Sequence, residues 1–358
     1  MPKQTIMITG GGGFIGCALS AKLVAQGADI VALDVLLPQV HRSDGRPARL
    51  PPSVRLIPFD VTNPVAWDAL LKVERPATVI HLAAETGTGQ SLNESARHGS
   101  VNVVGTCQMV DAFTRAGHTP DHLVLASSRA VYGEGGWLTG DEVYYPTVRT
   151  HEVLAQGRWV PESATGSLGT PLPSVAGQTP TAPTNVYAAT KLAQEHILQA
   201  WCAARGSALS VLRFQNVYGP GQSLGNPYTG VLSIFTRQAL SGETINVFED
   251  GSIVRDFVHV EDVATAVGTA IRLPPKSSRL LDIGSGHSST ILEVATLVAE
   301  LAGAPSPVVS GQFRDGDVRA ACCSIDAART DLGFDPKWNL AEGLGALVAN
   351  ARQELDAS

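Results

Sequence analysis

The chain has 358 residues, of which 44% are hydrophobic and 16% are charged, and its formal net charge is −7. That length exceeds the size at which a single hydrophobic core stops growing, so we expect one large domain with a smaller companion. The sequence contains no apolar run near twenty residues, which a membrane-spanning helix requires. It also lacks the clustered lysines and arginines of a nucleic-acid surface. We therefore expect a soluble globular protein that binds neither membranes nor nucleic acids.

The start of the chain and the cysteines indicate the compartment. Met1 to Gly10 lacks a charged and then apolar leader and runs almost directly into an apolar strand, which predicts a cytoplasmic protein. The five cysteines show no C-x-x-C spacing, and an odd number fits reduced thiols better than a disulfide framework. We therefore assign no metal or redox chemistry to Cys17, Cys107, Cys202, Cys322 and Cys323.

A glycine-rich turn follows the first apolar run. Thr9–Gly16 stands between the apolar residues 6–8 and a helical pattern. Glycines at this spacing let the backbone leave a strand tightly, approach a pyrophosphate and pack a helix closely on the sheet. Free N–H groups at the helix start would then bind the phosphates. The register that begins at Gly11 fits as well as the one that begins at Gly10, and both predict a dinucleotide site. The expected contacts are Gly10, Gly13, Phe14, Ile15 and Gly16.

Strands and helices alternate through the first half of the chain. Apolar runs predict the strands, and apolar periodicity with capping residues predicts the helices. A proline-rich stretch at 38–53 predicts a surface loop. Because this alternation produces a parallel sheet covered on both faces, we expect a doubly wound α/β fold of the Rossmann type. The expected strands are 4–9, 29–33, 54–59, 78–84 and 122–126, and the expected helices are 14–27, one from 62, one ending near 115, and 187–204.

Two aspartates end strands beside the expected dinucleotide site. Asp34 lies 18 residues after Gly16, which is where an acid accepts hydrogen bonds from the adenosine ribose and repels a 2′-phosphate. This position favours NAD over NADP, although an ordinary turn aspartate would also fit. Asp60 ends the next strand and is equally compatible with a contact to the adenine amino group and with a cap of the following turn.

Tyr187 and Lys191 are four residues apart in an expected helix. That spacing places both side chains on one face, so an ammonium group lies near the phenol. A free tyrosine has a pKa of about 10, and a neighbouring positive charge lowers that pKa. We therefore expect Tyr187 to act as a base near neutral pH. As an isolated pattern this spacing is more often a solvated helical pair, and it gains specificity from the glycine turn, from Asp34 and from the serines that end the fifth strand.

Together these motifs resemble the extended short-chain dehydrogenase/reductases, in the branch of nucleotide-sugar epimerases and dehydratases. The resemblance implies NAD as the cofactor and a nucleotide sugar as the substrate. It also implies a homodimer in which helices 94–115 and 187–204 of two subunits pair. It extends over Thr9–Gly16, Asp60–Val61, His81–Ala84, Asn102, Ser127–Gly133, Tyr187–Lys191, Arg213–Gly219 and Arg255–Val263.

The resemblance implies roles for individual residues. Ser128 corresponds to the hydroxyl that binds the reacting sugar oxygen, and Tyr187 corresponds to the acid/base. Lys191 corresponds to the group that holds the nicotinamide ribose and polarises the tyrosine. The residues implied to hold the diphosphate are Asn216, Arg255 and Arg314. Further implied cofactor contacts are Val61, Leu82, Ala83, Ala84 and Asn102, and further implied substrate contacts are Glu85, Thr86 and Arg129.

Several residues refine this interpretation. A surface ion pair is the plain alternative for Arg255 and for Arg314, and Gln215 stands where an aromatic residue is common in the family. In dehydratases of the family, the acid/base pair resembles an Asp-Glu dipeptide directly after the hydroxyl residue. This chain has Arg129 and Ala130 there, and neither side chain can usefully exchange a proton. We therefore expect 4-epimerisation through a transient 4-keto sugar, without elimination or decarboxylation.

Short stretches also resemble the nucleotide-sugar 4-epimerases within the family. These are Pro38–His41, Glu85–Ser91, Ser128–Gly135 and Asn226–Val231. They specify a substrate less firmly than the core motifs specify the family, so dTDP-sugars and UDP-sugars both stay open. A 4-ketoreductase or dehydratase of the same family is the alternative enzyme, and a non-catalytic NAD-binding sensor is the alternative class, because a fold alone does not imply chemistry.

The two expected domains are discontinuous in the sequence. We expect residues 1–215 and 253–272 to form the NAD-binding domain, and residues 216–252 and 273–358 to form the smaller C-terminal substrate-binding domain. Residues 134–184 are rich in glycine and proline, so apart from 151–159 we expect no long helix or strand there. We expect this segment to cover the sugar pocket as a flap, with Trp137 or Trp159 as an apolar contact. A disordered or partner-facing insertion is the alternative.

Overall fold

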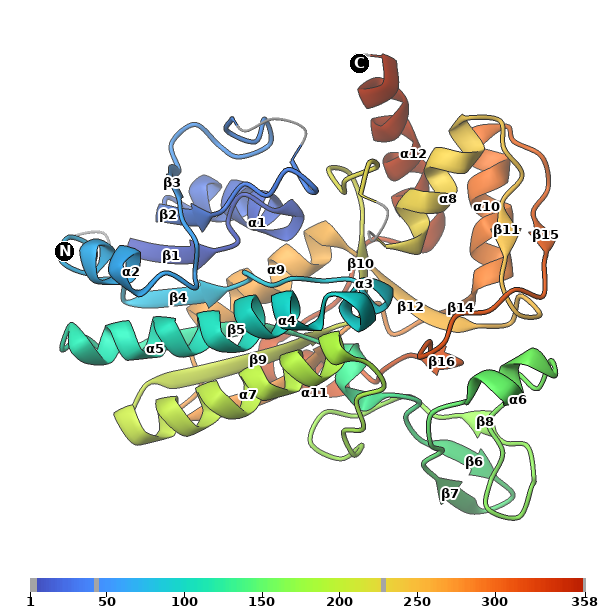
Figure 1. The fold of residues 1–358 in the computed structure, drawn as a ribbon. Coiled ribbons are helices and arrows are strands. Elements are labelled where there is room, and N and C mark those ends of the chain that lie inside the picture. The colour runs from blue at the N-terminus through green and yellow to red at the C-terminus, as the bar shows by residue number, and fades with distance from the viewer. Residues whose placement is uncertain (1–4, 42–44, 227–229, 357–358) are drawn as a thin grey trace.

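The computed structural model describes residues 5–41, 45–226 and 230–356 (Figure 1). Its largest element is a seven-stranded sheet in the order β13-β9-β5-β4-β1-β2-β3, in which every neighbouring pair runs parallel. The expected doubly wound α/β fold is confirmed. The strands of this central sheet are β1 (Thr5–Thr9), β2 (Asp29–Asp34), β3 (Arg55–Pro58), β4 (Thr78–His81), β5 (His122–Ser128), β9 (Ala208–Phe214) and β13 (Ser278–Ile283).

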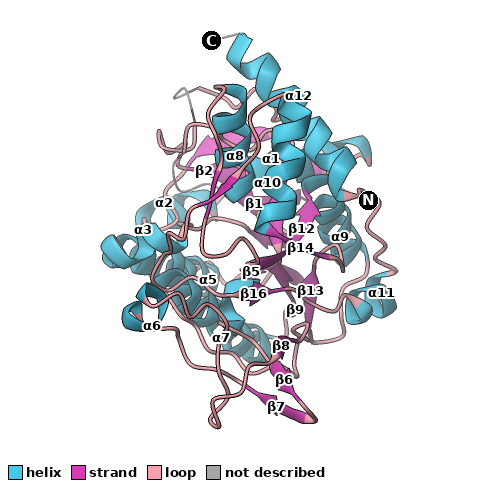
Figure 2. Ribbon diagram, turned by 90° about the vertical axis from the view of Figure 1, so that its right-hand side faces the viewer, coloured by secondary structure: helices cyan, strands magenta, loops and turns pink. Residues whose placement is uncertain are grey.

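Helices cover both faces of the central sheet, because successive residues of a strand point to opposite sides. Ile8 belongs to an apolar cluster with Val263, whereas its neighbour Met7 belongs to a second cluster with Trp67 and Phe113. Figure 2 shows the two helix layers on either side of the strands. The first layer contains α1 (Phe14–Ala25), α9 (Val260–Arg272) and α11 (Asp326–Leu332), and the second contains α2 (Pro64–Leu70), α5 (Gly105–Arg115) and α7 (Val186–Arg205). Within the described ranges, no helix is long and apolar enough to cross a membrane.

Capping residues fix where two of these helices begin. The side-chain oxygen of Asn63 accepts hydrogen bonds from the N–H groups of the first turn of α2. Asn185 caps α7 in the same way, by accepting from the N–H of Ala188 at 2.9 Å. Gly206, at φ +72°, ends α7 in the left-handed conformation. Because Tyr187 lies in the first turn of α7, the Asn185 cap also fixes the position of the phenol.

The helix that the sequence predicts to end near residue 115 contains a break. α4 (Ser95–His98) passes into a π-helical stretch, η1 (Gly99–Val104), before α5 continues. The wider turn of a π-helix redirects side chains relative to a regular helix, and such turns often occur at functional sites. Asn102 lies within this stretch. The apolar periodicity predicted the helix but not the break.

A smaller lobe packs around a third apolar cluster, which includes Phe235, Val294 and Leu347. It lies at the upper right of Figure 1. Its helices are α8 (Val231–Leu240), α10 (Ile291–Ala302) and α12 (Leu340–Asp356), and its strands are β10 (Asn216–Tyr218), β11 (Asn246–Val247), β12 (Val254–His259), β14 (Ser288–Thr290), β15 (Val308–Val309) and β16 (Ala320–Ala321).

Two parts of the expected domain division need correction. We expected residues 253–272 in the NAD-binding domain, but β12 pairs with β10 and β14 of the smaller lobe. We expected residues 273–358 in the smaller domain, but β13 forms an edge of the central sheet by pairing with β9. Ala328 and Leu332 of α11 pack in the apolar cluster beneath that sheet. These two elements therefore belong with the large lobe, because a strand hydrogen-bonded into a sheet shares its core. The division into two domains otherwise stays a proposal.

Residues 134–184, which we call the outer segment, lie at the lower right of Figure 1. They contain a small antiparallel sheet in the order β7-β6-β8. The regular element that was expected only near 151–159 is a short helix that ends at Ala155. The sheet was not predicted, because strands of two or three residues leave too short a pattern. The bounds are β6 (Trp137–Thr139), β7 (Glu142–Tyr144), α6 (His151–Ala155) and β8 (Thr170–Pro171).

Candidate active site

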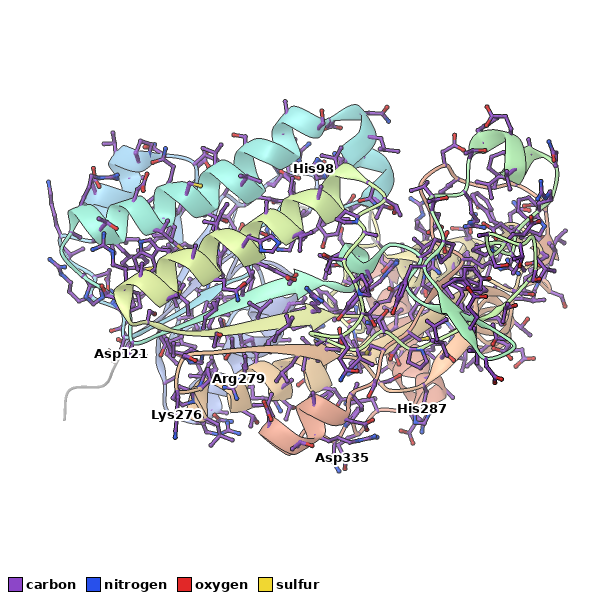
Figure 3. All side chains as sticks on the ribbon, turned by 90° about the horizontal axis from the view of Figure 1, so that it is seen from below. His98, Asp121, Lys276, Arg279, His287 and Asp335 are labelled. Atoms are coloured by element: carbon purple, nitrogen blue, oxygen red, sulfur yellow. The ribbon has the colours of Figure 1, made fainter. Side chains whose placement is uncertain are left out.

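A cavity of about 970 Å³ lies at the carboxyl ends of the central strands and is lined by residues of both lobes. Asp121 and Arg279, labelled in Figure 3, mark the opposite, amino-terminal edge of the sheet. Among the predicted site residues, Asn102 and Lys191 do not line the cavity. Those that line it are Gly10, Gly13, Phe14, Ile15, Gly16, Asp34, Asp60, Val61, Leu82, Ala83, Ala84, Glu85, Thr86, Ser128, Arg129, Tyr187, Asn216, Arg255 and Arg314.

The glycine loop adopts the register that begins at Gly10. Gly10 has a φ of +68°, and a Cβ there would lie 2.7 Å from the backbone nitrogen of Ala83. A Cβ at Gly16 would lie 2.6 Å from the carbonyl oxygen of Gly10. Gly11 does not line the cavity and instead packs against Ala32 of β2. The sequence left two registers open, and backbone packing selects one.

The N-terminus of α1 opens on the cavity. Gly13 is the N-cap residue, and it offers the helix no capping side chain, while the first turn carries no acidic residue. Phe14 and Ile15 of that turn line the cavity. The backbone N–H groups at a helix start and the positive end of the helix dipole favour an anionic group. The residues present therefore fit the pyrophosphate of a dinucleotide.

Asp34 connects the glycine loop to the end of β2. One carboxylate oxygen accepts a hydrogen bond from the N–H of Gly12 at 2.9 Å, and the other accepts from the N–H of Leu36 at 2.9 Å. His41 lies beside it, with 3.6 Å between Nε2 and Oδ1. Asp34 thus lines the cavity and also holds a turn. Asp60 likewise lines the cavity and caps the following turn through Thr62, so both interpretations of each aspartate are compatible with the geometry.

Ser128 and Tyr187 face each other in the cavity, at the end of β5 and the start of α7. Burial raises the pKa of Tyr187, while a hydrogen bond with Ser128 and the positive charge of Arg129 oppose that rise. The lowered pKa that we expected is therefore absent, because the desolvation of the phenol outweighs the neighbouring groups. In the described structure the tyrosine is a neutral hydroxyl, and a further positive charge in the cavity would favour its phenolate.

Lys191 lies one turn further along α7, below the cavity. The residue is 2% exposed, and its Nζ donates a hydrogen bond to Oε1 of Gln194 at 2.5 Å. Burial lowers the pKa of Lys191 to about 7, and the charge of Glu195 opposes that change. The lysine therefore sits close to the balance point between its charged and neutral forms at neutral pH.

A buried polar network beneath the cavity was not predicted. His81 of β4 contacts the Thr9 hydroxyl at 2.7 Å and the Thr106 hydroxyl at 2.9 Å. The Nε2 of Gln194 donates to Thr106 at 2.8 Å. Burial, with a smaller effect of Lys191, lowers the pKa of His81 to about 3, so this imidazole is neutral. The network joins β1, β4, α5 and α7, and it connects Lys191 to the centre of the sheet.

Asn102 is placed differently from the expected cofactor contact. Its side chain is fully buried, and its oxygen accepts a hydrogen bond from the N–H of Glu85 at 2.8 Å. Its nitrogen donates to the Glu85 carbonyl at 3.0 Å and to the Thr190 hydroxyl at 2.9 Å. The side-chain amide of Asn102 is therefore bonded to Glu85 and Thr190 of the protein rather than directed into the cavity. The π-helical turn therefore places Asn102 as a clamp between the loop after β4 and helix α7.

Basic side chains gather at the part of the cavity that the smaller lobe lines. The Arg255 guanidinium is 5% exposed and contacts Asp317 Oδ1 at 2.7 Å, so it is not a surface pair. Burial and the charge of Arg255 lower the pKa of Arg129 to about 10. Arg129 also donates to Oδ1 of Asn216 at 3.3 Å. The guanidinium of Arg314 lies 5.0 Å from the ring centre of Phe248. These three arginines at one part of the cavity favour a multiply charged anion.

Many cavity residues escaped the sequence analysis, and three of them bear directly on the site. Asp317 stands in the same short motif as Arg314, and an acid three residues from an expected phosphate-binding arginine could have suggested a partner for Arg255. Arg97 pairs with Glu85 at 2.9 Å and lines the cavity. Phe248 lines it too, and nothing in its sequence surroundings marks it.

Gln215 resolves the question of packing that its sequence position raised. Its side chain is buried, and within the described residues neither amide atom has a hydrogen-bond partner in the structure. A Cβ on Gly284 would lie 2.8 Å from Cγ of Gln215 and 2.9 Å from the thiol sulfur of Cys323. Gln215 therefore lines the cavity and packs closely against Gly284.

The outer segment does not form the expected flap. Within the described ranges none of residues 134–184 lines the large cavity. Trp137 is 2% exposed and donates its indole N–H to the carbonyl of Glu134. Trp159 packs on Phe313, with 6.0 Å between ring centres. Both tryptophans thus contact protein rather than the cavity. From the stretch at 226–231, Asn226 lines the cavity, and residues 227–229 lie outside the described residues.

Comparison with known proteins places this geometry in a family. The chain is 48% identical, over 99% of its length and 96% of the relative, to a dTDP-L-rhamnose 4-epimerase of Burkholderia thailandensis. It is 30% identical, over 96% of both chains, to a UDP-glucose 4-epimerase of Mycolicibacterium smegmatis. The solved UDP-glucose 4-epimerase of Thermus thermophilus in complex with NAD superimposes with a TM-score of 0.77 at 28% identity, over 98% of this chain and 99% of that one. The profile of the NAD-dependent epimerase/dehydratase family matches residues 6–153 and 161–284. The chain therefore belongs to the NAD-dependent epimerase/dehydratase family, and NAD is its cofactor.

Proposed function

We propose that the protein catalyses the NAD-dependent 4-epimerisation of a nucleotide-activated hexose. The observation that carries the proposal is the position of Ser128 and Tyr187 in the same cavity as three arginines. A hydroxyl pair can handle a proton on a sugar oxygen, and guanidinium groups suit a diphosphate. The names of the relatives, which include dTDP-L-rhamnose and UDP-glucose 4-epimerases, support a dTDP- or UDP-sugar as the substrate.

The proton moves at Oη of Tyr187. We propose that Ser128 holds the sugar hydroxyl while Tyr187 removes its proton, and that Tyr187 returns a proton after the sugar has turned. Bound NAD supplies the acceptor, and then the donor, of the hydride at the sugar carbon. Lys191 lies buried one turn further along α7, and we propose that its charge acts on the tyrosine. Since its pKa lies at about 7, a change in the local field is enough to change its charge.

The sugar ring must present both faces to the hydride while its nucleotide stays bound. We propose that Arg255, Arg314 and Arg129 hold the diphosphate, with Asn216 beside them. The cavity of about 970 Å³ takes in both the cofactor end and the arginine end, and we propose that the ring rotates in the part between Ser128 and the arginines. The bound diphosphate prevents escape of the keto sugar. Rotation of the sugar ring allows the second hydride transfer to the opposite face.

The reaction should stop at epimerisation. Arg129 and Ala130 occupy the two positions after Ser128, and a guanidinium and a methyl group cannot serve as the acid and base of an elimination. Deuterium placed on the oxidised carbon should therefore remain on that carbon in the product. Wash-in of solvent deuterium at the adjacent carbon, or a 4-keto-6-deoxy product, would show that another residue supplies the missing acid.

The direct test is a screen of dTDP-, UDP- and GDP-sugars with product stereochemistry determined by NMR. We expect one 4-epimer pair to equilibrate without added cofactor, because NAD is recycled. Stoichiometric consumption of NADPH would instead favour the 4-ketoreductase. If no nucleotide sugar turns over although NAD binds, the non-catalytic sensor becomes the better interpretation.

Two sequence-based expectations stay predictions. One is the homodimer through α5 and α7, in which pairing would stiffen the helix that carries Tyr187. A monomer by light scattering at micromolar concentration would reject it. The other is the cytoplasmic location, which fractionation of the source cells would test.

A further inference from the structure

A cluster of buried charges joins the outer segment to the smaller lobe. Arg149 and Glu134 come from the outer segment, Glu249 follows β11, and Arg319 precedes β16. Their side chains are between 1% and 7% exposed. We call these four residues the Arg149 cluster. None of them was predicted as functional, and none lines the cavity among the described residues.

Arg149 uses its guanidinium to hold three parts of the chain together. Its Nε donates to Oε1 of Glu134 at 3.0 Å, and one terminal nitrogen donates to Oε1 of Glu249 at 2.8 Å. The same nitrogen donates to the carbonyl of Trp159 at 2.9 Å, and the other donates to the carbonyl of Asp317 at 3.0 Å. The last bond reaches the segment that forms a wall of the cavity.

The cluster fixes both ends of residues 312–319. At one end, the N–H of Glu249 donates to the carbonyl of Gln312 at 2.7 Å. At the other, the N–H of Arg319 donates to Glu134 at 2.8 Å, and the Arg319 guanidinium donates to Glu249 at 2.8 Å. This short segment carries Arg314 and Asp317, both of which line the cavity.

Two neighbouring contacts act on the middle of the same segment. The ring of Phe313, directly before Arg314, packs against Trp159 at 6.0 Å and against His151 at 5.2 Å between ring centres. The hydroxyl of Thr184 donates to the carbonyl of Gly316 at 3.1 Å. The outer segment therefore supports the back of the wall whose front carries Arg314 and Asp317.

Burying four charges is costly, and apolar packing of equal volume would often stabilise a fold as well. Charge-assisted hydrogen bonds add direction, because the planar guanidinium fork donates to its partners in one geometry. Such a device suits a wall whose backbone must be held to within a fraction of an ångström for arginine side chains to meet a diphosphate.

We propose that Arg149 is a positioning residue for nucleotide-sugar binding, and that the outer segment acts as a buttress behind the wall that presents Arg314 and Asp317. The inference rests on the proposed function, because it assigns the diphosphate to this wall. It replaces the flap that the sequence suggested. The inference predicts that changes in the Arg149 cluster weaken binding of the nucleotide sugar but not binding of NAD, since no contact of the cluster reaches the glycine loop in the described structure.

The test compares Arg149→Met and Arg149→Lys with Arg158→Met. Arg158 lies in the same segment, but its side chain is 49% exposed and pairs with Glu162 at the surface. The measurements are the affinities for dTDP and UDP by calorimetry, the NAD content of purified protein, and kcat and KM for the nucleotide sugar found in the screen. Arg149→Met should weaken the binding of whichever of dTDP and UDP binds more tightly to the unaltered protein. It should also raise KM for the nucleotide sugar by about tenfold. NAD content and kcat should stay within about twofold.

Arg149→Lys should recover part of the affinity because it retains the charge without the fork, and Arg158→Met should resemble the unaltered protein. Unchanged nucleotide affinity in folded Arg149→Met, or parallel losses of NAD and nucleotide, would overturn the inference. If Arg149→Met does not fold, Trp159→Ala decides through its contact with Phe313: weaker nucleotide binding with normal NAD content supports the buttress, and unchanged binding overturns it. Intact dTDP or UDP binding without turnover of any sugar would overturn the proposed function alone.

Discussion

The two ends of the cavity are built in different ways. The cofactor end consists largely of backbone: the glycine loop, the N-terminus of α1 and the carboxyl ends of β1, β2 and β4. The substrate end consists of charged side chains from distant segments, among them Arg129, Arg255 and Arg314, with further support from behind by the Arg149 cluster. A backbone site depends on close packing, so it should fail when a Cβ is added. A side-chain site depends on charge geometry, so it should fail when a guanidinium is replaced.

The largest expected effect is at the junction of the two ends. Tyr187→Phe removes the only atom of that side chain that can exchange a proton, so turnover should fall by about 10³-fold, while NAD remains bound. The measurement is kcat together with the NAD content of the purified protein. Tyr145→Phe, at an exposed tyrosine of the outer segment, is the matched control. Residual turnover near that of the unaltered protein would show that another group transfers the proton.

The next effect separates the cofactor end from the substrate end. A Cβ at Gly16 would lie 2.6 Å from the Gly10 oxygen and 2.7 Å from Gly11 Cα, so Gly16→Ala must displace the loop at a cost of about 1–3 kcal/mol. NAD content should drop, and the affinity for dTDP or UDP should change little. Gly345→Ala in α12, where a Cβ meets nothing within 4 Å, is the control. Equal loss of NAD in both variants would contradict the packing argument.

The complementary change affects the substrate end. Arg255→Lys keeps the charge but loses the fork that contacts Asp317 and the backbone carbonyl of Val318. KM for the nucleotide sugar should rise by about tenfold, which corresponds to one charged hydrogen bond, with NAD content unchanged. Arg237→Lys, at an exposed position of α8, should have no effect. A fall in NAD content with normal KM would reverse the assignment of the two ends.

The smallest expected effect is a pH dependence of stability. Burial lowers the pKa of His81 from 6.5 to about 3 in the folded protein, so between these values the folded state binds fewer protons than the unfolded chain. The stabilising contribution is therefore complete above pH 6.5 and is lost as pH falls. His81→Gln should reduce the decrease in Tm between pH 7 and pH 5 by about 2–3 °C, since 1 kcal/mol corresponds to roughly 1–2 °C in a chain of this length. His196→Gln, at an exposed residue of α7, should leave the slope unchanged.

The sequence by itself determined the sheet, the cofactor and a substantial part of the cavity lining. The glycine turn, the strand-ending Asp34 and the Tyr187–Lys191 spacing are local patterns. The residues of a local pattern are close together in the sequence, so the pattern can be recognised before the fold is known. The predicted strands of the central sheet up to β5 all formed, with ends shifted by a few residues. Nineteen of the residues predicted from these motifs and from the family resemblance line the cavity.

Only the tertiary structure decided what depends on contacts between distant segments. The packing of Gly11 against Ala32 chose the register of the glycine loop, and burial reversed the expected direction of the Tyr187 pKa. The π-helical turn converted Asn102 from an expected cofactor contact into an internal clamp. The outer segment became a support rather than a flap because Arg149 finds its partners about 100 and 168 positions away in the sequence. Burial and long-range charge pairing are properties of the folded chain, so no local pattern records them.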